Sequence, residues 1–236
     1  VIRSGAYSRY VSTGSARKRH LQAARAGAEG DRRAMSIRPR AVPCPFFGRR
    51  IMHPVTPVED RHADGRLKAE IWPLPIDQPF LQSLFRDLFE NHWDKLTFGP
   101  MIAGGAYELR CPRAPDRVTV SGGYLTVHWG RNGHFHLCIG ESNADAETVA
   151  HRRPSKCELV RGRDKRGDPV TWSLRVENGH GESTLSIYFP NPFLTDGDGI
   201  ADTPDWSRLS LWHLILKSYA GQEADGLDTT GKGFRG

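Results

Sequence analysis

The sequence has no long hydrophobic run and none of the common nucleotide or hydrolase motifs. No apolar segment approaches the roughly 20 residues that a membrane-spanning helix needs, so we expect no membrane span. There is no G-x-x-x-x-G-K-S/T segment, which would cradle phosphates, and no G-x-S-x-G segment, which would present a nucleophilic serine. Integral-membrane, nucleotide-hydrolysing and serine-hydrolase functions therefore lack support.

Cysteine is scarce, and its spacing provides neither a zinc ribbon nor a redox pair. No two of the cysteines form a C-x-x-C segment; the four are Cys44, Cys111, Cys138 and Cys157. The sequence also lacks an Asn-x-Ser/Thr glycosylation site and an apolar signal-peptide core. We therefore expect reduced thiols and a soluble, cytoplasmic protein.

Charge is present but unevenly distributed. The chain has 33 basic and 27 acidic residues and a formal net charge of +6. Residues 1–50 hold 12 of the basic and 2 of the acidic residues, a local net charge of +10, so residues 51–236 carry −4. The basic character belongs to an Arg-rich leader over residues 1–51. Nucleic-acid binding by the rest of the chain is not expected.

The leader lacks periodic apolar residues, so we expect it to be disordered. Three interpretations stay open. It is an arm that binds nucleic acid or anionic lipid, an organelle-targeting peptide, or a stretch translated ahead of a true start at Met35 or Met52. The second interpretation would imply import into an organelle instead of a cytoplasmic location.

Two amphipathic helices and a run of strands are expected in the remaining chain. Apolar residues at helical spacing predict helices over 77–96 and 204–220. Alternation with a period of two predicts strands over 106–111, 116–121, 123–129, 134–140, 156–161, 169–176 and 183–189. The turns between these strands are short, which favours antiparallel pairing.

The sequence thus predicts a single α+β domain over residues 52–221. It consists of an antiparallel sheet of six or seven strands packed by two amphipathic helices. The polar, glycine-rich residues 222–236 are predicted to form a flexible tail.

The predicted hairpin over residues 124–140 concentrates side chains that bind metals. His134, His136 and Cys138 alternate with apolar residues, so all three point to one face of the strand. Two loops are considered, a two-residue Asn-Gly turn and a three-residue loop over 131–133. The three-residue loop places the apolar side chains of both strands on one face, so we prefer it.

The preferred register brings a third histidine to the same patch. It sets His128 opposite His136 and Thr126 opposite Cys138, with directly opposed Cβ atoms about 5 Å apart. Three neutral imidazoles with an open fourth position suit a zinc or iron ion that acidifies a bound water. Cys138 as a fourth ligand would close the site. The nearby candidates for proton transfer are Glu141, His151 and Tyr124.

Two main functions remain open. The first is metal binding through His128, His134, His136 and Cys138, including a metal-dependent enzyme that activates water. The second is a non-catalytic protein that binds a small ligand, an anion included, or docks a protein partner in an assembly or accessory role. Nucleic-acid binding through the leader is a third and less favoured possibility.

An acidic, glycine-rich stretch over residues 196–205 resembles the calcium loops of thrombospondin type 3 repeats and EF-hands. Its carboxylates are Asp196, Asp198, Asp202 and Asp205. Leu194 stands where such loops have their first ligand, so calcium is not expected. A connection that caps the following helix is the preferred interpretation.

The segments G-H-F-H-L-C-I-G, residues 133–140, and P-N-P-F-L, residues 190–194, are similar to segments of an uncharacterised bacterial protein family. The resemblance extends over residues 79–195. It implies no activity, and the sequence leaves open whether the chain is an enzyme.

Overall fold

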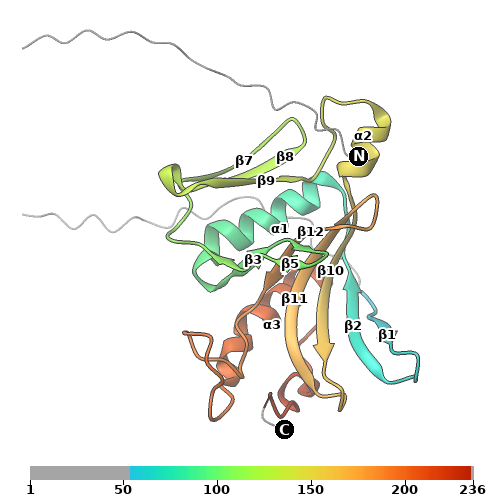
Figure 1. The fold of residues 1–236 in the computed structure, drawn as a ribbon, viewed down its shortest axis with the longest axis vertical. Helices are drawn as coiled ribbons and strands as arrows, with labels where there is room; N and C mark the ends of the chain where they lie inside the picture. Colours follow the sequence, from blue (N-terminus) through green and yellow to red (C-terminus); the bar gives the residue numbers. More distant parts are fainter. Residues whose placement is uncertain (1–53, 235–236) are drawn as a thin grey trace, which may run out of the picture. The chain divides into compact units, whose positions relative to one another are not determined.

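The computed structural model describes residues 54–234, and the leader predicted over residues 1–51 lies outside them. The described part contains a seven-stranded antiparallel sheet, here called the main sheet (Figure 1). Its strands, in spatial order, are β1 (Val58–Arg61), β2 (Leu67–Pro73), β10 (Pro154–Arg163), β11 (Pro169–Asn178), β12 (Ser183–Tyr188), β3 (Thr97–Gly99) and β6 (Leu109–Arg110).

A second sheet of three antiparallel strands, here called the small sheet, lies apart from the main sheet (Figure 1). Its strands are β7 (Arg117–Ser121), β8 (Tyr124–His128) and β9 (His134–Cys138). A short hairpin pairs β4 (Met101–Ile102) with β5 (Gly105–Ala106). The predicted α+β domain with a seven-stranded antiparallel sheet is confirmed. The predicted strands over 116–140, however, form a sheet of their own.

The first predicted helix begins where its capping residue indicates. Helix α1 spans Gln78–Asn91, and the amide of Phe80 donates a hydrogen bond of 3.1 Å to the Asp77 carboxylate. The helix ends earlier than predicted, because residues 93–95 form a 3₁₀ turn and residues 97–99 pair with β12 as β3. Pairing in the main sheet satisfies backbone groups that the last helical turn would otherwise have used.

The second predicted helix is present as one continuous helical segment. Helix α3 spans Ser210–Ile215, a 3₁₀ turn precedes it over Trp206–Leu209, and a π turn follows over Leu216–Ala220. Gly221 ends the segment with a left-handed backbone, φ 67°, which glycine adopts without strain. No helix within residues 54–234 is long and apolar enough to cross a membrane.

Helix α2 (Ala146–Arg152) is not among the elements predicted from the sequence. Asp145 caps it by accepting a hydrogen bond of 2.8 Å from the amide of Thr148. At seven residues the helix is too short to display an apolar stripe, and none of its residues is buried. The capping residue Asp145 was the one local feature of the sequence that indicated this helix.

Helix α1 lies between the main sheet and the small sheet (Figure 1). Five of its apolar side chains are completely buried: Leu81, Leu84, Phe85, Leu88 and Phe89. The ring of Phe89 contacts Phe98 of β3 and Phe135 of β9, each at 5.2 Å between ring centroids. This aromatic cluster joins the small sheet to the rest of the domain.

The C-terminal residues differ from the predicted flexible tail. Gly226–Thr229 form a 3₁₀ turn, and Asp228 within it is completely buried. The prediction was wrong for this segment because it rested on local composition, whereas the partners of Asp228 lie on β10, β11 and α3.

Candidate ligand-binding cavity

The hairpin β8–β9 closes with a five-residue loop, Trp129 to Gly133, instead of the predicted three-residue loop. His128 therefore faces His134, Thr126 faces His136, and the predicted pairing of His128 with His136 is wrong by two residues. Gly130 (φ 58°) and Gly133 (φ 104°) both adopt backbone conformations that favour glycine, which allows the longer loop. A two-residue shift leaves the alternation intact, so the predicted faces of both strands are retained.

The three predicted metal-ligating histidines form a row on the outer face of the small sheet. The His128 and His134 rings stack with centroids 5.3 Å apart, and His134 and His136 lie 4.8 Å apart. The amide of Gly130 donates to Nδ1 of His128 at 3.0 Å, so Nε2 of the neutral ring carries the proton and has no lone pair for a metal. Within residues 54–234 no three His, Cys, Asp or Glu side chains are arranged to hold a metal ion.

We expect the purified protein to contain far less than one zinc or iron ion per chain. Mass spectrometric metal analysis of the wild type and of His136→Ala measures this, and the two proteins should give the same low content. Near-stoichiometric metal that disappears in His136→Ala would instead restore the predicted metal site.

Four of the seven predicted site residues line one cavity of about 250 Å³. They come from the small sheet and from α2: Tyr124, His136, Cys138 and His151. The remaining lining residues are Leu137, Arg152, Asn178 and Thr184. The cavity therefore lies where the small sheet, α2 and the β11–β12 hairpin meet.

The turn between β11 and β12 fixes the position of α2. The amide of Gly179 donates a hydrogen bond of 3.0 Å to the carbonyl of His151. The side-chain oxygen of Asn178 accepts hydrogen bonds from the amides of His180 and Glu182, at 3.0 and 2.9 Å, and so holds the turn in shape. A Cβ atom at Gly179 would lie 2.0 Å from the carbonyl oxygen of Ala150. Only glycine allows this close approach of the turn to the helix.

Substitution Gly179→Ala is therefore expected to push α2 away from the turn and to cost about 1–3 kcal/mol of stability, as overpacking typically does. Hydrogen exchange should show reduced protection of the amides of residues 149–153. Gly197→Ala is the matched control, because a Cβ there meets no atom within 4 Å. Equal protection in the two variants would contradict the close approach.

The charged groups at the cavity are arranged asymmetrically. The His151 ring stacks on His180 with centroids 3.6 Å apart, and its Nε2 lies 3.3 Å from the carboxylate of Glu182. Hydrogen bonds from Asn178 and His151 hold the pKa of Glu182 below its ordinary value of 4.5, so this carboxylate is charged at neutral pH. Glu182 bonds to His151, which lines the cavity, but Glu182 itself does not line it.

Arg152 contributes a cation that no carboxylate of residues 54–234 neutralises. The neighbouring Arg153 pairs with Glu141 at 3.7 Å, which removes Glu141 from the group of side chains at the cavity. The thiol of Cys138 donates to the carbonyl of Gly140 at 3.4 Å. The three predicted proton-transfer residues are thus not brought together, since only His151 and Tyr124 line the cavity.

The calcium-like stretch is held by arginines and by the helix that follows it. Asp196 pairs with Arg208 at 2.6 Å, and Asp198 pairs with Arg110. Asp205 accepts a hydrogen bond of 3.1 Å from the amide of Ser207 and caps the second helical segment. The predicted helix-capping connection is confirmed.

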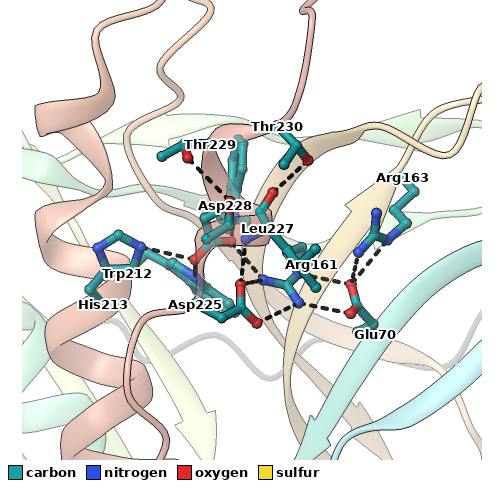
Figure 2. Close-up of polar contacts among 12 residues, drawn as sticks. Glu70, Arg161, Arg163, Trp212, His213, Asp225, Leu227, Asp228, Thr229 and Thr230 are labelled. Carbon is teal, nitrogen blue, oxygen red and sulfur yellow. Dashed lines mark hydrogen bonds and ion pairs between the residues drawn. The ribbon is translucent and has the colours of Figure 1, made fainter.

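A second group of polar residues, which the sequence did not reveal, surrounds the buried side chain of Arg161 (Figure 2). Its members include Glu70, Arg161, Asp225 and Asp228. Burial alone raises the pKa of Glu70, but the hydrogen bonds and charges of Arg161 and Arg163 outweigh it and hold the pKa below 4.5. The strand carries other charged residues as well, among them Lys156 and Glu158, so the sequence did not single out Arg161.

The described residues form an α+β domain in which a small polar cavity lies beside the small sheet. The model of a family of unknown function, DUF7676, matches residues 58–221, and the chain belongs to this family. The match confirms the resemblance to an uncharacterised family. No curated protein sequence matches the chain.

Two solved structures of ChuX are similar to the described fold. "Crystal structure of ChuX" gives a TM-score of 0.42, and "Structure of the Heme Binding Protein ChuX" gives 0.40. In both cases the identity is 15%, and the match covers 64% of this chain and 76% of the other. Similarity at this level carries no information about ligand or activity.

Proposed function

We propose that this protein is a non-catalytic binding protein for a small anionic molecule, which it holds in the cavity between the small sheet, α2 and the β11–β12 turn. The observation that supports the proposal most strongly is the composition of the cavity. Among the residues that line it there is an arginine without a carboxylate partner, and there is no acidic side chain.

The available hydrogen-bonding groups favour an anion. The Thr184 hydroxyl already donates to the carbonyl of Val176, and the Asn178 amide group already donates to Glu182. The groups left to face a ligand are the guanidinium of Arg152, the imidazoles of His136 and His151, and the phenol of Tyr124. Arg152 donates without exception, and Tyr124 and the Nε2 of His136 are able to donate, whereas Nε2 of His151 is already bonded to Glu182. Charge-assisted bonds from Arg152 to a carboxylate or phosphate are the strongest of these.

The size of the cavity restricts the ligand. Its volume of about 250 Å³ lies just below the roughly 300–1,000 Å³ of typical cofactor and drug-sized sites. A small organic acid or a single phosphate group fits such a volume, and a large cofactor would not be enclosed.

Isothermal titration of the full chain with citrate and with inorganic phosphate tests the proposal. Arg152→Gln is expected to weaken binding of the preferred anion by at least about tenfold, because a charge-assisted hydrogen bond is worth roughly 1.5–3 kcal/mol. Arg131→Gln is the matched control, since it removes the same charge from an exposed loop residue outside the cavity. Equal weakening by both variants, or no binding of either anion to the wild type, would contradict the proposal.

A further inference from the structure

Asp228 lies at the centre of a complete set of carboxylate-binding groups (Figure 2). Its Oδ1 accepts hydrogen bonds from Nε1 of Trp172 at 2.7 Å and from a terminal nitrogen of Arg161 at 3.1 Å. Its Oδ2 lies 3.1 Å from Nε1 of Trp212 and 2.9 Å from Nε2 of His213. The four groups come from β10, β11 and α3, and Asp228 has no exposed surface.

These groups require an anionic or strongly accepting partner. The indole nitrogens of Trp172 and Trp212 only donate, and Arg161 keeps its proton at any ordinary pH. Arg161 and Trp212 are almost fully buried, so water cannot reach their donor groups. Leaving these donors without an acceptor would therefore be costly. The site is thus built to bind a carboxylate whichever molecule supplies it.

Two carboxylates tie the segment to Arg161, and a hydrogen bond of 2.9 Å from Arg166 to the carbonyl of Gly233 holds its distal end. Asp225 pairs with the same guanidinium of Arg161 through both of its oxygens, at 2.7 and 3.1 Å. The side chain of Leu227, which lies between the two acids in the sequence, is 45% exposed. An i, i+3 pair of carboxylates on a short turn is therefore the charged element that reaches these groups.

The binding groups and their occupant are separate along the chain. All four groups lie within residues 58–221, which the family model matches, whereas Asp225 and Asp228 lie beyond them. The site is also distinct from the cavity of the proposed function, because none of its residues lines that cavity.

We propose that Arg161, Trp172, Trp212 and His213 form a binding site for acidic peptides with an Asp-x-x-Asp pattern, and that the chain's own residues 222–234 occupy it in cis. The C-terminal segment then acts as a competitor. A partner peptide with the same pair of carboxylates binds only where this segment is displaced.

The test uses the full chain with Asp225→Asn and Asp228→Asn combined, and a fluorescently labelled synthetic peptide with the sequence of residues 222–234. Both substitutions keep the shape of the side chains and remove the two charges. Fluorescence anisotropy is expected to show saturable binding to the double variant at least tenfold tighter than to the wild type, whose site is filled. The same peptide with asparagine in place of both aspartates, Asp225 and Asp228, should not bind.

Two controls separate specific binding from changes in net charge and from unfolding. Asp60→Asn combined with Asp64→Asn removes the same charge at a half-buried and an exposed position outside the site, and should leave peptide binding at the wild-type level. His213→Ala, added to the double variant, should weaken binding. If the double variant unfolds but the peptide restores its circular dichroism, the proposal is supported. A variant that the peptide does not restore, or one that is folded and does not bind the peptide, would overturn it.

Discussion

Replacing Arg161 by methionine is expected to lower the free energy of unfolding by about 3–5 kcal/mol, the typical result of removing one partner from a buried ion pair. The Arg161 guanidinium bonds Glu70 through two nitrogens, at 2.8 and 2.7 Å, and reaches Asp228 as well. Without it, Asp228 loses its guanidinium partner and the Trp72 ring loses the cation above it, 5.3 Å from its centroid. A carboxylate that is buried without a cation is costly.

Equilibrium unfolding in urea measures the effect. Arg175→Met is the matched control, because Arg175 on the neighbouring strand pairs with Glu158 at a site where about a third of its side chain is exposed. Partly exposed pairs contribute at most about 1 kcal/mol, so the control should be nearly neutral. Comparable losses in the two variants would show that the buried network does not stabilise the fold in the proposed way.

Replacing Phe89 by alanine is expected to cost a similar amount, about 3–5 kcal/mol, which is usual for a fully buried phenylalanine. Phe89 is completely buried and contacts three aromatic rings: Phe98 at 5.2 Å, Phe135 at 5.2 Å and Trp129 at 6.5 Å. Two of these rings belong to the small sheet or its loop and one to the main sheet. The substitution therefore weakens the aromatic contacts that hold the small sheet, which lines the cavity, against the rest of the domain.

The loss of this junction should be visible in two measurements. Urea unfolding gives the loss of stability, and hydrogen exchange should show that the amides of β7, β8 and β9 lose protection before those of the main sheet. Phe80→Ala is the control on the same helix, because Phe80 is only partly buried and contacts Tyr219. Uniform loss of protection over both sheets would contradict the view that Phe89 acts at the junction.

The sequence predicted those elements whose signals are local. Asp77 and the apolar spacing after it marked α1, and the alternation from Val170 to Val176 marked β11. Strand β2 escaped prediction because Ala69 and Glu70 are adjacent and both buried, which breaks the alternation. Glu70 is buried since Arg161, 91 residues further on, neutralises it. A pattern along the chain does not show such a partner.

The sequence predicted only part of the candidate site, because the rest depends on residues that are distant along the chain. Alternation in β9 placed His134, His136 and Cys138 on one face of the strand, and the register failed because it depends on the backbone of Gly130 and Gly133. The contribution of α2 and of the β11–β12 turn to the cavity required the tertiary structure. His151 was named from the sequence, whereas its neighbour Arg152 became prominent only when the structure showed it without a carboxylate partner at the cavity.

The most direct test of an anion-binding cavity is a nuclear magnetic resonance titration of the full chain with citrate, followed through backbone amide shifts. We predict saturable shifts that cluster at residues 136–138, 150–153 and 178–184, and that Arg152→Gln abolishes them at the same citrate concentration while Arg131→Gln does not. Shifts that cluster elsewhere, or that persist unchanged in Arg152→Gln, would contradict the account.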